Sequence, residues 1–367
     1  MKKQITRVLI MAASMNMGGA ETFIMKVFRK IDREKIMFDF MVNEKKPGVY
    51  DKEIRILGGK IYQGAFKSRY PVKSFYYIYR TVKDNNFKVV LRLSAHPLAF
   101  IDLLAARCGG ADKLIIRSTN TKAGGIISNI LACITRPILN RIADIRIAPS
   151  TEAGTWLFGK RQINLGNVIF LQNGIELEKF HYCEEIRNSV RRKLGIEESF
   201  VVGHVGRFHE QKNHLFLIKV FNEIVKNNPS AVLLLIGEGE REEEIRKYVE
   251  ALELTKYVLF LGKRMDVGKL MQAMDIFLFP SFYEGMPNTV LEAQAVGLPC
   301  FISDTITEEV KLTDLVTFLS LKEDALKWCK HIMGTNIAYR YDRGLEIKKK
   351  GYSIEDTVNC LSKIIEE

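Results

Sequence analysis

The chain has 367 residues, 47% of them hydrophobic and 27% charged, which is typical of an ordinary globular protein and argues against a disordered or fibrous one. Its six cysteines are widely spaced, with no C-x-x-C pair and no Cys/His ligand spacing. This argues against structural zinc and a disulfide framework and favours a cytoplasmic location. No apolar run approaches the ~18 residues of a spanning helix, and the length predicts two domains.

Charge is distributed unevenly along the chain. Residues 1–180 contain 30 Lys and Arg against 14 Asp and Glu, whereas residues 181–367 contain 25 against 29. The basic first half is expected to contact an anionic surface. Nucleic acid is not expected as a partner, because no reading motif or aromatic–basic interleaving accompanies the charge.

The first half alternates strands and helices, which predicts an α/β fold with a parallel sheet covered on both faces. Strands are expected at Thr6–Ala12, Lys35–Val42, Lys88–Ser94, Lys113–Arg117, Ile145–Pro149 and Asn167–Leu171. Helices are expected at Glu21–Arg29, Tyr50–Leu57, Ser74–Lys83, Ala99–Cys108 and Ile126–Arg141.

The alternation resumes after a hinge at Asn173–Cys183 and a charged helix, so a second Rossmann-like domain is predicted. Its strands are expected at Phe200–Val205, Ala231–Ile236, Val258–Leu261, Asp275–Phe279 and Pro299–Ser303. Helices are expected at Cys183–Leu194, Leu215–Asn227, Arg241–Leu252, Thr289–Ala295 and Ser353–Ile365.

The most informative motif is Ser281–Pro299, which follows an apolar run typical of a buried strand. A Gly-Met-Pro-Asn turn leads into a helix that is expected to start near Pro287 or Asn288. Free backbone N–H groups at such a helix start bind anions. Glu284 and Glu292 bracket the turn and would repel phosphate, so they are expected to accept hydrogen bonds from hydroxyl groups. Phosphates together with hydroxyls indicate a nucleotide-sugar site.

Two cations, Arg207 and Lys212, follow the strand Phe200–Val205 and suit a diphosphate. The alternative is that both are solvated surface charges. In the first half, Gly18-Gly19-Ala20-Glu21 follows the first strand without a G-x-G-x-x-G pattern. It is either a plain tight turn or a loop whose N–H groups face the donor phosphates.

No D-x-D pair occurs in the chain, although enzymes that hold a nucleotide diphosphate through a metal usually need carboxylates for it. A site that needs neither a metal nor a cofactor besides its nucleotide-sugar co-substrate is therefore predicted. His96 comes after a strand and before Pro97, and it is either an active-site group or an ordinary buried histidine.

Together these motifs resemble glycosyltransferase family 4, the retaining nucleotide-sugar transferases of GT-B fold. The resemblance rests on Gly206-Arg207 with Gln211-Lys212-Asn213, and on the E-x7-E motif formed by Glu284 and Glu292. It extends to Leu235–Gly239, Phe260–Gly262, Gln172–Ile175 and, more loosely, Pro149–Gly154. Gly297–Thr307 is most similar to members that build bacterial capsule or exopolysaccharide.

The resemblance implies two Rossmann-like domains facing across a cleft. They would be an acceptor domain over residues 1–180, a donor domain over 181–345, and a segment at 346–367 whose helix returns to the first domain. It also implies roles for single residues. Arg207 and Lys212 would stabilise the leaving diphosphate, Glu284 would hold the donor sugar, and Glu292 would bind the ribose. The remaining donor contacts would be Gly19, Arg264, Gly285, Met286, Pro287 and Asn288.

One departure from the family pattern concerns the first-domain histidine, because Arg117-Ser118-Thr119-Asn120-Thr121 stands in its place. Arg117, Asn120 or His96 are therefore candidates for the sugar or acceptor contact. The expected activity is transfer of a hexose or N-acetylhexosamine from a nucleotide sugar, in particular a UDP-sugar, to a polyprenyl-diphosphate-linked glycan. The alternatives are a soluble sugar or sugar-phosphate acceptor, or a non-catalytic membrane-associated scaffold of the same fold.

The basic first half and the absence of a spanning helix predict peripheral binding to the anionic inner face of the cell membrane. Gly125–Arg146 is the candidate contact, because it combines Ile126, Ile127, Ile130, Leu131 and Ile134 with Arg136, Arg141 and Arg146. The alternative is a helix that packs into the core and has solvated basic flanks.

Overall fold

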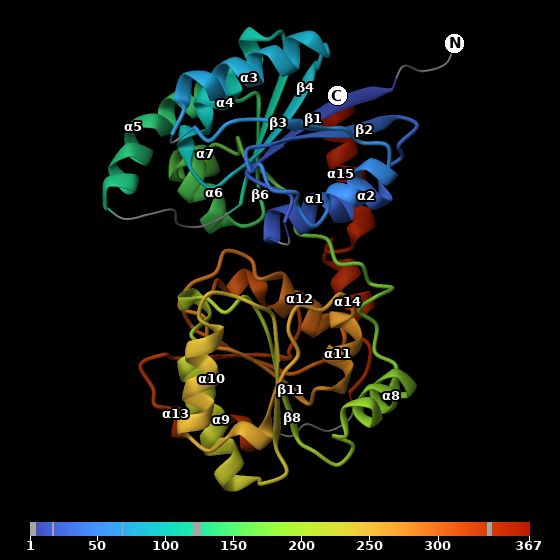
Figure 1. The fold of residues 1–367 in the computed structure, drawn as a ribbon, viewed down its shortest axis with the longest axis vertical. Helices are drawn as coiled ribbons and strands as arrows, with labels where there is room; N and C mark the ends of the chain where they lie inside the picture. The colour runs from blue at the N-terminus through green and yellow to red at the C-terminus, as the bar shows by residue number, and fades with distance from the viewer. Residues whose placement is uncertain (1–4, 17, 68, 120–125, 336–339) are drawn as a thin grey trace. The chain divides into compact units, whose positions relative to one another are not determined.

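The computed structural model describes residues 5–16, 18–67, 69–119, 126–335 and 340–367, and for 126–128 only the backbone (Figure 1). The chain divides into two compact units. Unit 1 comprises residues 1–174 and 354–367, and unit 2 comprises residues 175–353. Among the helices of the described ranges, none has both the length and the apolar character needed to cross a membrane.

Unit 1 contains a seven-stranded parallel sheet with the strand order β3-β2-β1-β4-β5-β6-β7. The strands are β1 (Thr6–Ala12), β2 (Ile36–Val42), β3 (Ile61–Gln63), β4 (Val89–Ser94), β5 (Lys113–Ser118), β6 (Ile145–Ala148) and β7 (Ile169–Phe170). Val8 of β1 is in register with Phe38 of β2 on one side and Val89 of β4 on the other. Because the strand order reverses between β1 and β4, the loops that follow these strands form a ligand-binding position.

Helices cover both faces of this sheet. They are α1 (Gly19–Lys30), α2 (Asp51–Ile56), α3 (Pro71–Asp84), α4 (Phe100–Cys108), α5 (Ile126–Ile142), α6 (Thr151–Phe158), α7 (Lys160–Asn164) and α15 (Ile354–Glu366). Phe23 of α1 and Leu361 of α15 belong to the core on one face, and Val82 of α3 and Leu103 of α4 to the core on the other. Helices α1 and α15 lie against each other, which places the end of the chain in unit 1 (Figure 1).

Unit 2 contains a six-stranded sheet, again parallel, with the order β10-β9-β8-β11-β12-β13. The strands are β8 (Val201–Val205), β9 (Val232–Ile236), β10 (Val258–Phe260), β11 (Ile276–Phe279), β12 (Cys300–Ser303) and β13 (Val316–Leu319). Its helices are α8 (Glu184–Leu194), α9 (His214–Asn227), α10 (Glu242–Ala251), α11 (Val267–Ala273), α12 (Asn288–Ala295), α13 (Ala325–Met333) and α14 (Gly344–Lys349). The strand order reverses between β8 and β11, which are neighbours in the sheet.

Most expected elements are present within a few residues, and the two parallel sheets confirm the predicted fold class. The division of the chain differs from the predicted one. The boundary falls after Gly174 instead of residue 180, because Ile175 bridges to Ser353 and packs in the core of unit 2. Of the segment 346–367, only the part from Ile354 onward packs on unit 1, and α14 belongs to unit 2.

Candidate active site

The two loops with the predicted donor-site motifs lie next to each other in unit 2. Residues 206–213 follow β8, and residues 280–287 follow β11. Because β8 and β11 pair in parallel, with Ile276 opposite Val202, their carboxyl ends meet where the strand order reverses. This is the position at which doubly wound sheets bind ligands.

Three polar contacts join these loops. The Phe282 amide donates to the Gln211 carbonyl oxygen over 2.9 Å, and the Gln211 side-chain amide donates to the Tyr283 carbonyl oxygen over 2.7 Å. Lys212 Nζ lies 2.6 Å from Glu284 Oε1. The cation predicted to meet a diphosphate and the carboxylate predicted to hold a sugar therefore form one ion pair.

The surroundings of Lys212 fix the position of its ammonium group. The ammonium lies 4.5 Å from the ring centroid of Phe279, and the Lys212 and Glu284 side chains are only 18% and 12% exposed. Partial burial strengthens the attraction between the two charges compared with that at an open surface. The pair holds the Lys212 ammonium in place at the carboxyl end of the sheet, with Glu284 balancing its charge.

Helix α12 begins at Asn288, as the Gly-Met-Pro-Asn turn predicted, with Pro287 in extended conformation before it. The Val290 and Leu291 amides donate to the Pro287 carbonyl oxygen at 3.1 and 3.4 Å. The amides before them, at the very start of the helix, are those that can bind an anion. Met286 is buried, and Gly285 connects it to Glu284. Glu292 lies one turn into α12 with 8% exposure, so its carboxylate is sheltered from bulk water.

The two predicted arginines of the site are exposed. Arg207 lies at the exit of β8, and no ion pair joins its guanidinium to another side chain of the described residues. The pKa of the Glu240 carboxyl is lowered mainly by a hydrogen bond from the backbone of Glu240 itself, and the positive charge of Arg207 lowers it further. Arg264 instead forms two 2.8 Å hydrogen bonds to Asp266, which raise the pKa of its guanidinium.

Glycine is required where the loop after β9 meets the start of the Arg207 loop. Gly237 has φ of +143°, and a Cβ added there would lie 2.0 Å from the Gly206 carbonyl oxygen. A side chain at this position would push the two backbones apart. The close approach of Gly237 therefore helps to fix the loop that carries Arg207 and Lys212.

Two buried histidines, His204 and His214, flank the loop that contains Arg207 and Lys212. His204 Nδ1 donates to the Leu278 carbonyl oxygen over 2.9 Å, and its ring centroid lies 4.8 Å from that of His214. Burial, reinforced by the neighbouring charge of Lys212, lowers the pKa of His214 to about 3 and that of His204 well below its usual value. Both imidazoles are therefore neutral at physiological pH.

Acidification is expected to destabilise unit 2 through this pair. In the unfolded chain a histidine takes up a proton near pH 6.5, whereas folded His214 does so only near 3. Below pH 6.5 the unfolded state therefore binds more protons than the folded state, and the free energy of unfolding decreases as the pH is lowered. For His214 alone the free energy of unfolding should fall by about 2 kcal/mol between pH 7 and pH 5. Urea unfolding at both pH values measures this.

A variant can separate this effect from general acid denaturation. His214→Phe should make the pH dependence shallower, because a phenyl ring can stack on Phe208 as the imidazole does at 4.6 Å but cannot be protonated. His331→Phe is the control, since His331 is exposed. An unchanged pH dependence in His214→Phe would contradict this account.

In unit 1, His96 lines a cavity of about 340 Å³ that lies beyond β1 and β4. Its Nδ1 accepts a hydrogen bond from the Leu98 amide over 3.1 Å and caps the turn before α4. Gly19 starts α1, and an added Cβ there would meet no atom of the described residues within 4 Å.

Of the other two first-domain candidates, Arg117 does not line this cavity. Arg117 is 2% exposed, its Nη2 lies 2.5 Å from Asn173 Oδ1, and its guanidinium lies over the Phe23 ring. Burial lowers the pKa of Arg117 to about 9, so it stays charged at neutral pH inside the unit. Asn120 lies outside the described residues.

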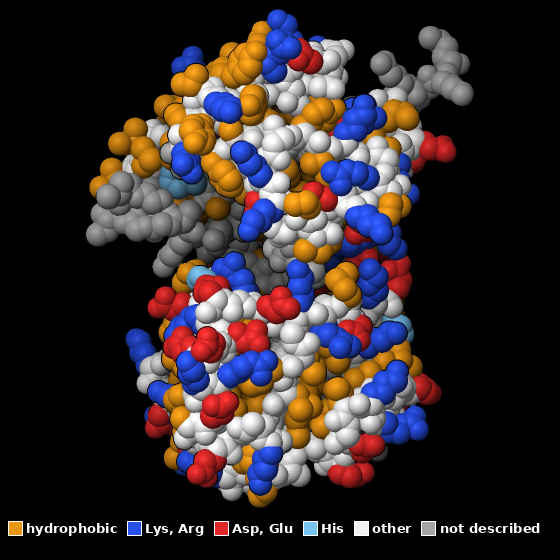
Figure 2. Space-filling model, viewed as in Figure 1, with side chains coloured by type: hydrophobic (Ala, Val, Ile, Leu, Met, Phe, Trp, Pro, Cys, Tyr) orange, Lys and Arg blue, Asp and Glu red, His pale blue; other side chains and the backbone are white. Residues whose placement is uncertain are grey.

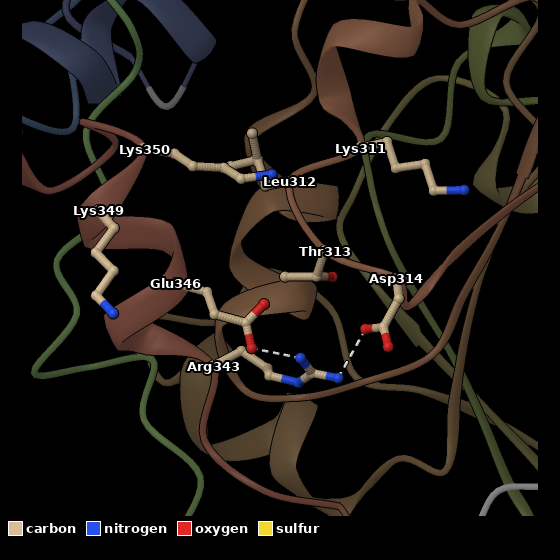
Figure 3. Close-up of a pocket in the computed structure, with 8 residues that line it drawn as sticks. All are labelled: Lys311, Leu312, Thr313, Asp314, Arg343, Glu346, Lys349 and Lys350. Atoms are coloured by element: carbon tan, nitrogen blue, oxygen red, sulfur yellow. Dashed lines mark hydrogen bonds and ion pairs between the residues drawn. The ribbon is translucent and has the colours of Figure 1, made fainter.

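A larger hollow of about 560 Å³ on unit 2 contains none of the predicted site residues (Figure 3). At its centre Arg343 is neutralised by Asp314, at 2.7 Å, and by Glu346. Lys311 and Lys349 lie on opposite sides of the hollow, and the end of the Lys350 side chain lies near Leu312, so the three cations do not gather at one point (Figure 3). The arrangement does not form an anion site.

Several residues important for the geometry were not singled out from the sequence. His204 and His214 act through contacts between segments distant in the chain, so no local pattern gives their roles. Gln211 belongs to the motif Gln211-Lys212-Asn213, but its contact with Tyr283 was not predicted. Arg92 could have been noticed, because it interrupts the apolar strand Val89–Ser94. A charge inside a buried strand needs a partner. Among the described residues, no cluster of three or more His, Cys, Asp or Glu side chains could hold a metal ion.

Comparison with known proteins finds similarity to glycosyltransferases. The family model described as glycosyl transferases group 1 matches residues 186–320. The chain is 35% identical over 368 residues to the putative glycosyltransferase EpsF of Bacillus subtilis strain 168, covering 98% of this chain and 96% of that protein. It is 26% identical over 311 residues to the Escherichia coli UDP-Gal:alpha-D-GlcNAc-diphosphoundecaprenol alpha-1,3-galactosyltransferase, covering 78% of each chain.

Among solved structures, HepE of Anabaena in complex with UDP-glucose superposes with a TM-score of 0.78 at 18% identity, covering 98% of this chain and 99% of that one. This likeness concerns the fold. The similarity to EpsF, in contrast, extends over nearly the full length of both proteins. With two parallel sheets and the matched motifs of unit 2, the chain belongs to the group 1 glycosyltransferases of family 4 and has the GT-B fold.

Proposed function

We propose that the protein transfers a sugar, with retention of anomeric configuration, from a UDP-sugar to a lipid-linked glycan in capsule or exopolysaccharide synthesis. The observation that carries this proposal is the Lys212–Glu284 ion pair beside the start of α12. The substrates are supported by relatives: HepE is in complex with UDP-glucose, and the E. coli protein is named for transfer from UDP-Gal to a diphosphoundecaprenol-linked sugar.

In the proposed reaction, the bond between the sugar's anomeric carbon and the diphosphate oxygen breaks, and a bond to the acceptor oxygen forms on the same face. The departing phosphate oxygen takes the acceptor's proton, so no protein nucleophile is needed. Negative charge grows on the diphosphate as the bond breaks. Lys212, Arg207 and the first amides of α12 stabilise that charge, and such stabilisation accelerates the step.

The carboxylates bind the neutral parts of the donor. Glu284, with the backbone of residues 285–288, accepts hydrogen bonds from the sugar hydroxyls, and Glu292 accepts them from the ribose. Glu292 is already buried, so the ribose hydroxyls that bind there replace their hydrogen bonds to water with hydrogen bonds to a sheltered carboxylate. Arg264 lies near the base of the donor. To contact the base, its guanidinium must either release Asp266 or keep that hydrogen bond while a free N–H group contacts the base.

The donor assignment is tested by thermal shift with UDP-, GDP-, ADP- and TDP-sugars, all in EDTA. UDP-sugars should give the largest stabilisation, and turnover should survive EDTA, because cations of the protein and helix amides meet the diphosphate charge. Glu292→Ala should weaken UDP binding by about 1.5–3 kcal/mol, since a buried carboxylate that accepts two hydroxyl bonds is lost. Turnover that stops in EDTA and returns with Mg²⁺ would contradict the metal-independent site.

Exposed apolar side chains on the surface of unit 1 support the proposal of a membrane-bound acceptor. On α5, Ile130, Ile134 and Ile138 are 57%, 64% and 42% exposed, while Ala132 and Leu139 face the core. Of the apolar side chains in the predicted contact, Ile130, Leu131 and Ile134 are thus exposed, and those of Ile126 and Ile127 lie outside the described residues. The opposite side of α5 packs on the core of unit 1, as the alternative expected. Figure 2 shows hydrophobic side chains over α5 and α3.

The basic part of this surface differs from the predicted one. Arg136 and Arg146 donate to backbone carbonyls of unit 1, which leaves Arg141 exposed at the end of α5. Helix α3 and the loop before it add exposed Arg69 and Lys73, together with Val72 and Tyr76. Helix α4 lies between α3 and α5 and contacts both. We propose that these helices bind the anionic inner leaflet reversibly.

A further inference from the structure

The polar side chain of His204 lies in the buried middle of the sheet in unit 2. It belongs to β8, which lies between β9 and β11, and it is only 1% exposed. The other residues of this strand are Val201, Val202, Gly203 and Val205. Burying an imidazole among apolar neighbours costs free energy unless its polar atoms have partners. Packing alone therefore does not explain a histidine at this position.

The ring of His204 continues the connection between two strands where their backbone pairing stops. In the described structure the pairing of β8 with β11 ends with Gly203 opposite Phe277. In the same register His204 would be opposite Leu278, and there its Nδ1 donates to the Leu278 carbonyl oxygen over 2.9 Å. The side chain thus takes over from the backbone. It extends the link between β8 and β11 toward the two donor-site loops.

The other edge of the ring faces the loop after β8. Nε2 of His204 is buried and has no hydrogen-bond partner among the described residues. A Cβ added to Gly206 would lie 2.8 Å from this nitrogen and 3.3 Å from both Cδ and Cε of Lys212. The imidazole, the Gly206 backbone and the Lys212 side chain therefore meet with no room for a methyl group between them. Burial is the main reason why the pKa of His204 is lowered, so the ring is neutral and Nε2 presents a lone pair on this side.

Aromatic contacts hold the imidazole in this orientation. The His204 ring stacks on Phe279 with 5.5 Å between the centroids, and the His214 ring meets it edge-on at 4.8 Å. The Lys212 ammonium lies 4.5 Å from the centroid of the same Phe279 ring. A movement of the imidazole would therefore reach Lys212 by two routes, through the Gly206 backbone and through the Phe279 ring.

We propose that His204 is a positioning residue of the donor site, whose ring holds the Gly206 backbone and thereby the Lys212 ammonium in place. The inference rests on the proposed function, in which Lys212 opposes the charge of the leaving diphosphate, and adds the residue that aims this cation. A displacement of about 1 Å in such a group can cost roughly 100-fold in rate. UDP binding is less sensitive, because Arg207 and the amides of α12 also contribute to it.

The test compares two replacements of nearly equal size, His204→Asn and His204→Leu. The asparagine amide can still donate to the Leu278 carbonyl oxygen, whereas leucine cannot. Turnover is measured as UDP release from the UDP-sugar that stabilises the wild type most, with farnesyl-diphosphate-linked N-acetylglucosamine as the acceptor and both substrates saturating. It should fall about 30-fold or more in His204→Leu and only about three- to tenfold in His204→Asn. UDP affinity, measured by calorimetry, should stay within about threefold of the wild type in both.

Stability separates positioning from packing. Leucine suits a buried strand with apolar neighbours, whereas the asparagine amide keeps buried polar atoms without partners. His204→Leu should therefore unfold at a urea concentration at least as high as His204→Asn, so that activity and stability rank the two variants in opposite order. The control is Ile224→Ala, which removes buried apolar atoms from α9 in the same unit. It should lower stability and leave turnover unchanged.

Two results would overturn the positioning role while leaving the proposed function intact. One is wild-type turnover in His204→Leu, or turnover that follows stability across the three variants. The other comes from ¹⁵N NMR of histidine-labelled protein, in which the His204 signals are assigned by their loss in His204→Leu. Neutral His204 should carry its proton on Nδ1, and a proton on Nε2 would contradict the geometry. If the wild type neither binds UDP nor transfers sugar, the proposed function fails, and this inference fails with it.

Discussion

Replacing Lys212 by alanine should lower turnover by about 100-fold or more, with a smaller change in UDP affinity. The ammonium is preformed between Glu284 and the Phe279 ring, so it opposes the charge of the leaving diphosphate without having to reorganise. Arg207→Ala should lower turnover to a similar extent, because its exposed guanidinium can approach the same phosphates. Initial rates at saturating donor and acceptor measure both variants.

The matched control is Lys219→Ala, which removes an exposed lysine from α9 in the same unit. Lys212→Arg adds a second comparison, since it keeps the charge but replaces a point cation by a planar fork. Near-normal turnover in both the Lys212→Ala and Arg207→Ala variants would contradict the assigned leaving-group role. A loss in Lys219→Ala would indicate a general effect of surface charge.

The second large effect is expected at the membrane. Changing Ile130, Ile134 and Ile138 together to serine should lower binding to anionic liposomes by roughly 100-fold, because three half-exposed isoleucines contribute about 3 kcal/mol when they insert. The remaining binding should fall as salt rises, since it depends on Arg69, Lys73 and Arg141. Flotation at low and high salt separates the two contributions.

A triple change of exposed apolar residues in unit 2, Met265, Leu326 and Leu345 to serine, is the control for a general loss of apolar surface. It should float like the wild type. Equal partitioning of wild-type protein onto neutral and anionic liposomes would contradict the electrostatic part of the proposal. No partitioning onto either would favour a soluble acceptor.

The fold was predictable because long apolar runs alternate with amphipathic segments, and the start of α12 at Asn288 was marked by local turn chemistry. Elements supported by fewer residues were missed. Strand β3 has three residues, β13 four and α11 seven, and the amphipathic nine-residue helix α13 was not predicted either. Their formation depends on packing against neighbours that the local sequence does not specify.

The sequence was sufficient to predict which loops form the site, but not which of their side chains contact each other. Strand exits identified the loops of Arg207 and Glu284, but the pairing of Lys212 with Glu284 depends on β8 and β11 being neighbours. Arg117 also lies near the end of a strand, but its side chain is buried inside unit 1. There its guanidinium donates to the Asn173 side chain and lies over the Phe23 ring. A side chain's direction at a strand end is decided by the tertiary structure.

The return of α15 to unit 1 has a consequence for the order in which the protein matures during synthesis. The core around Phe23 is incomplete until Leu361 and its neighbours on α15 have been made, and all of unit 2 is translated in between. At about 5–20 residues per second, this leaves an apolar groove along α1 unfilled for roughly ten to forty seconds. Because the core of unit 2 itself includes Ile347 and Tyr352, unit 2 is complete only just before α15 is made. Chaperones would therefore find an exposed target on the earlier half of the chain for most of its synthesis.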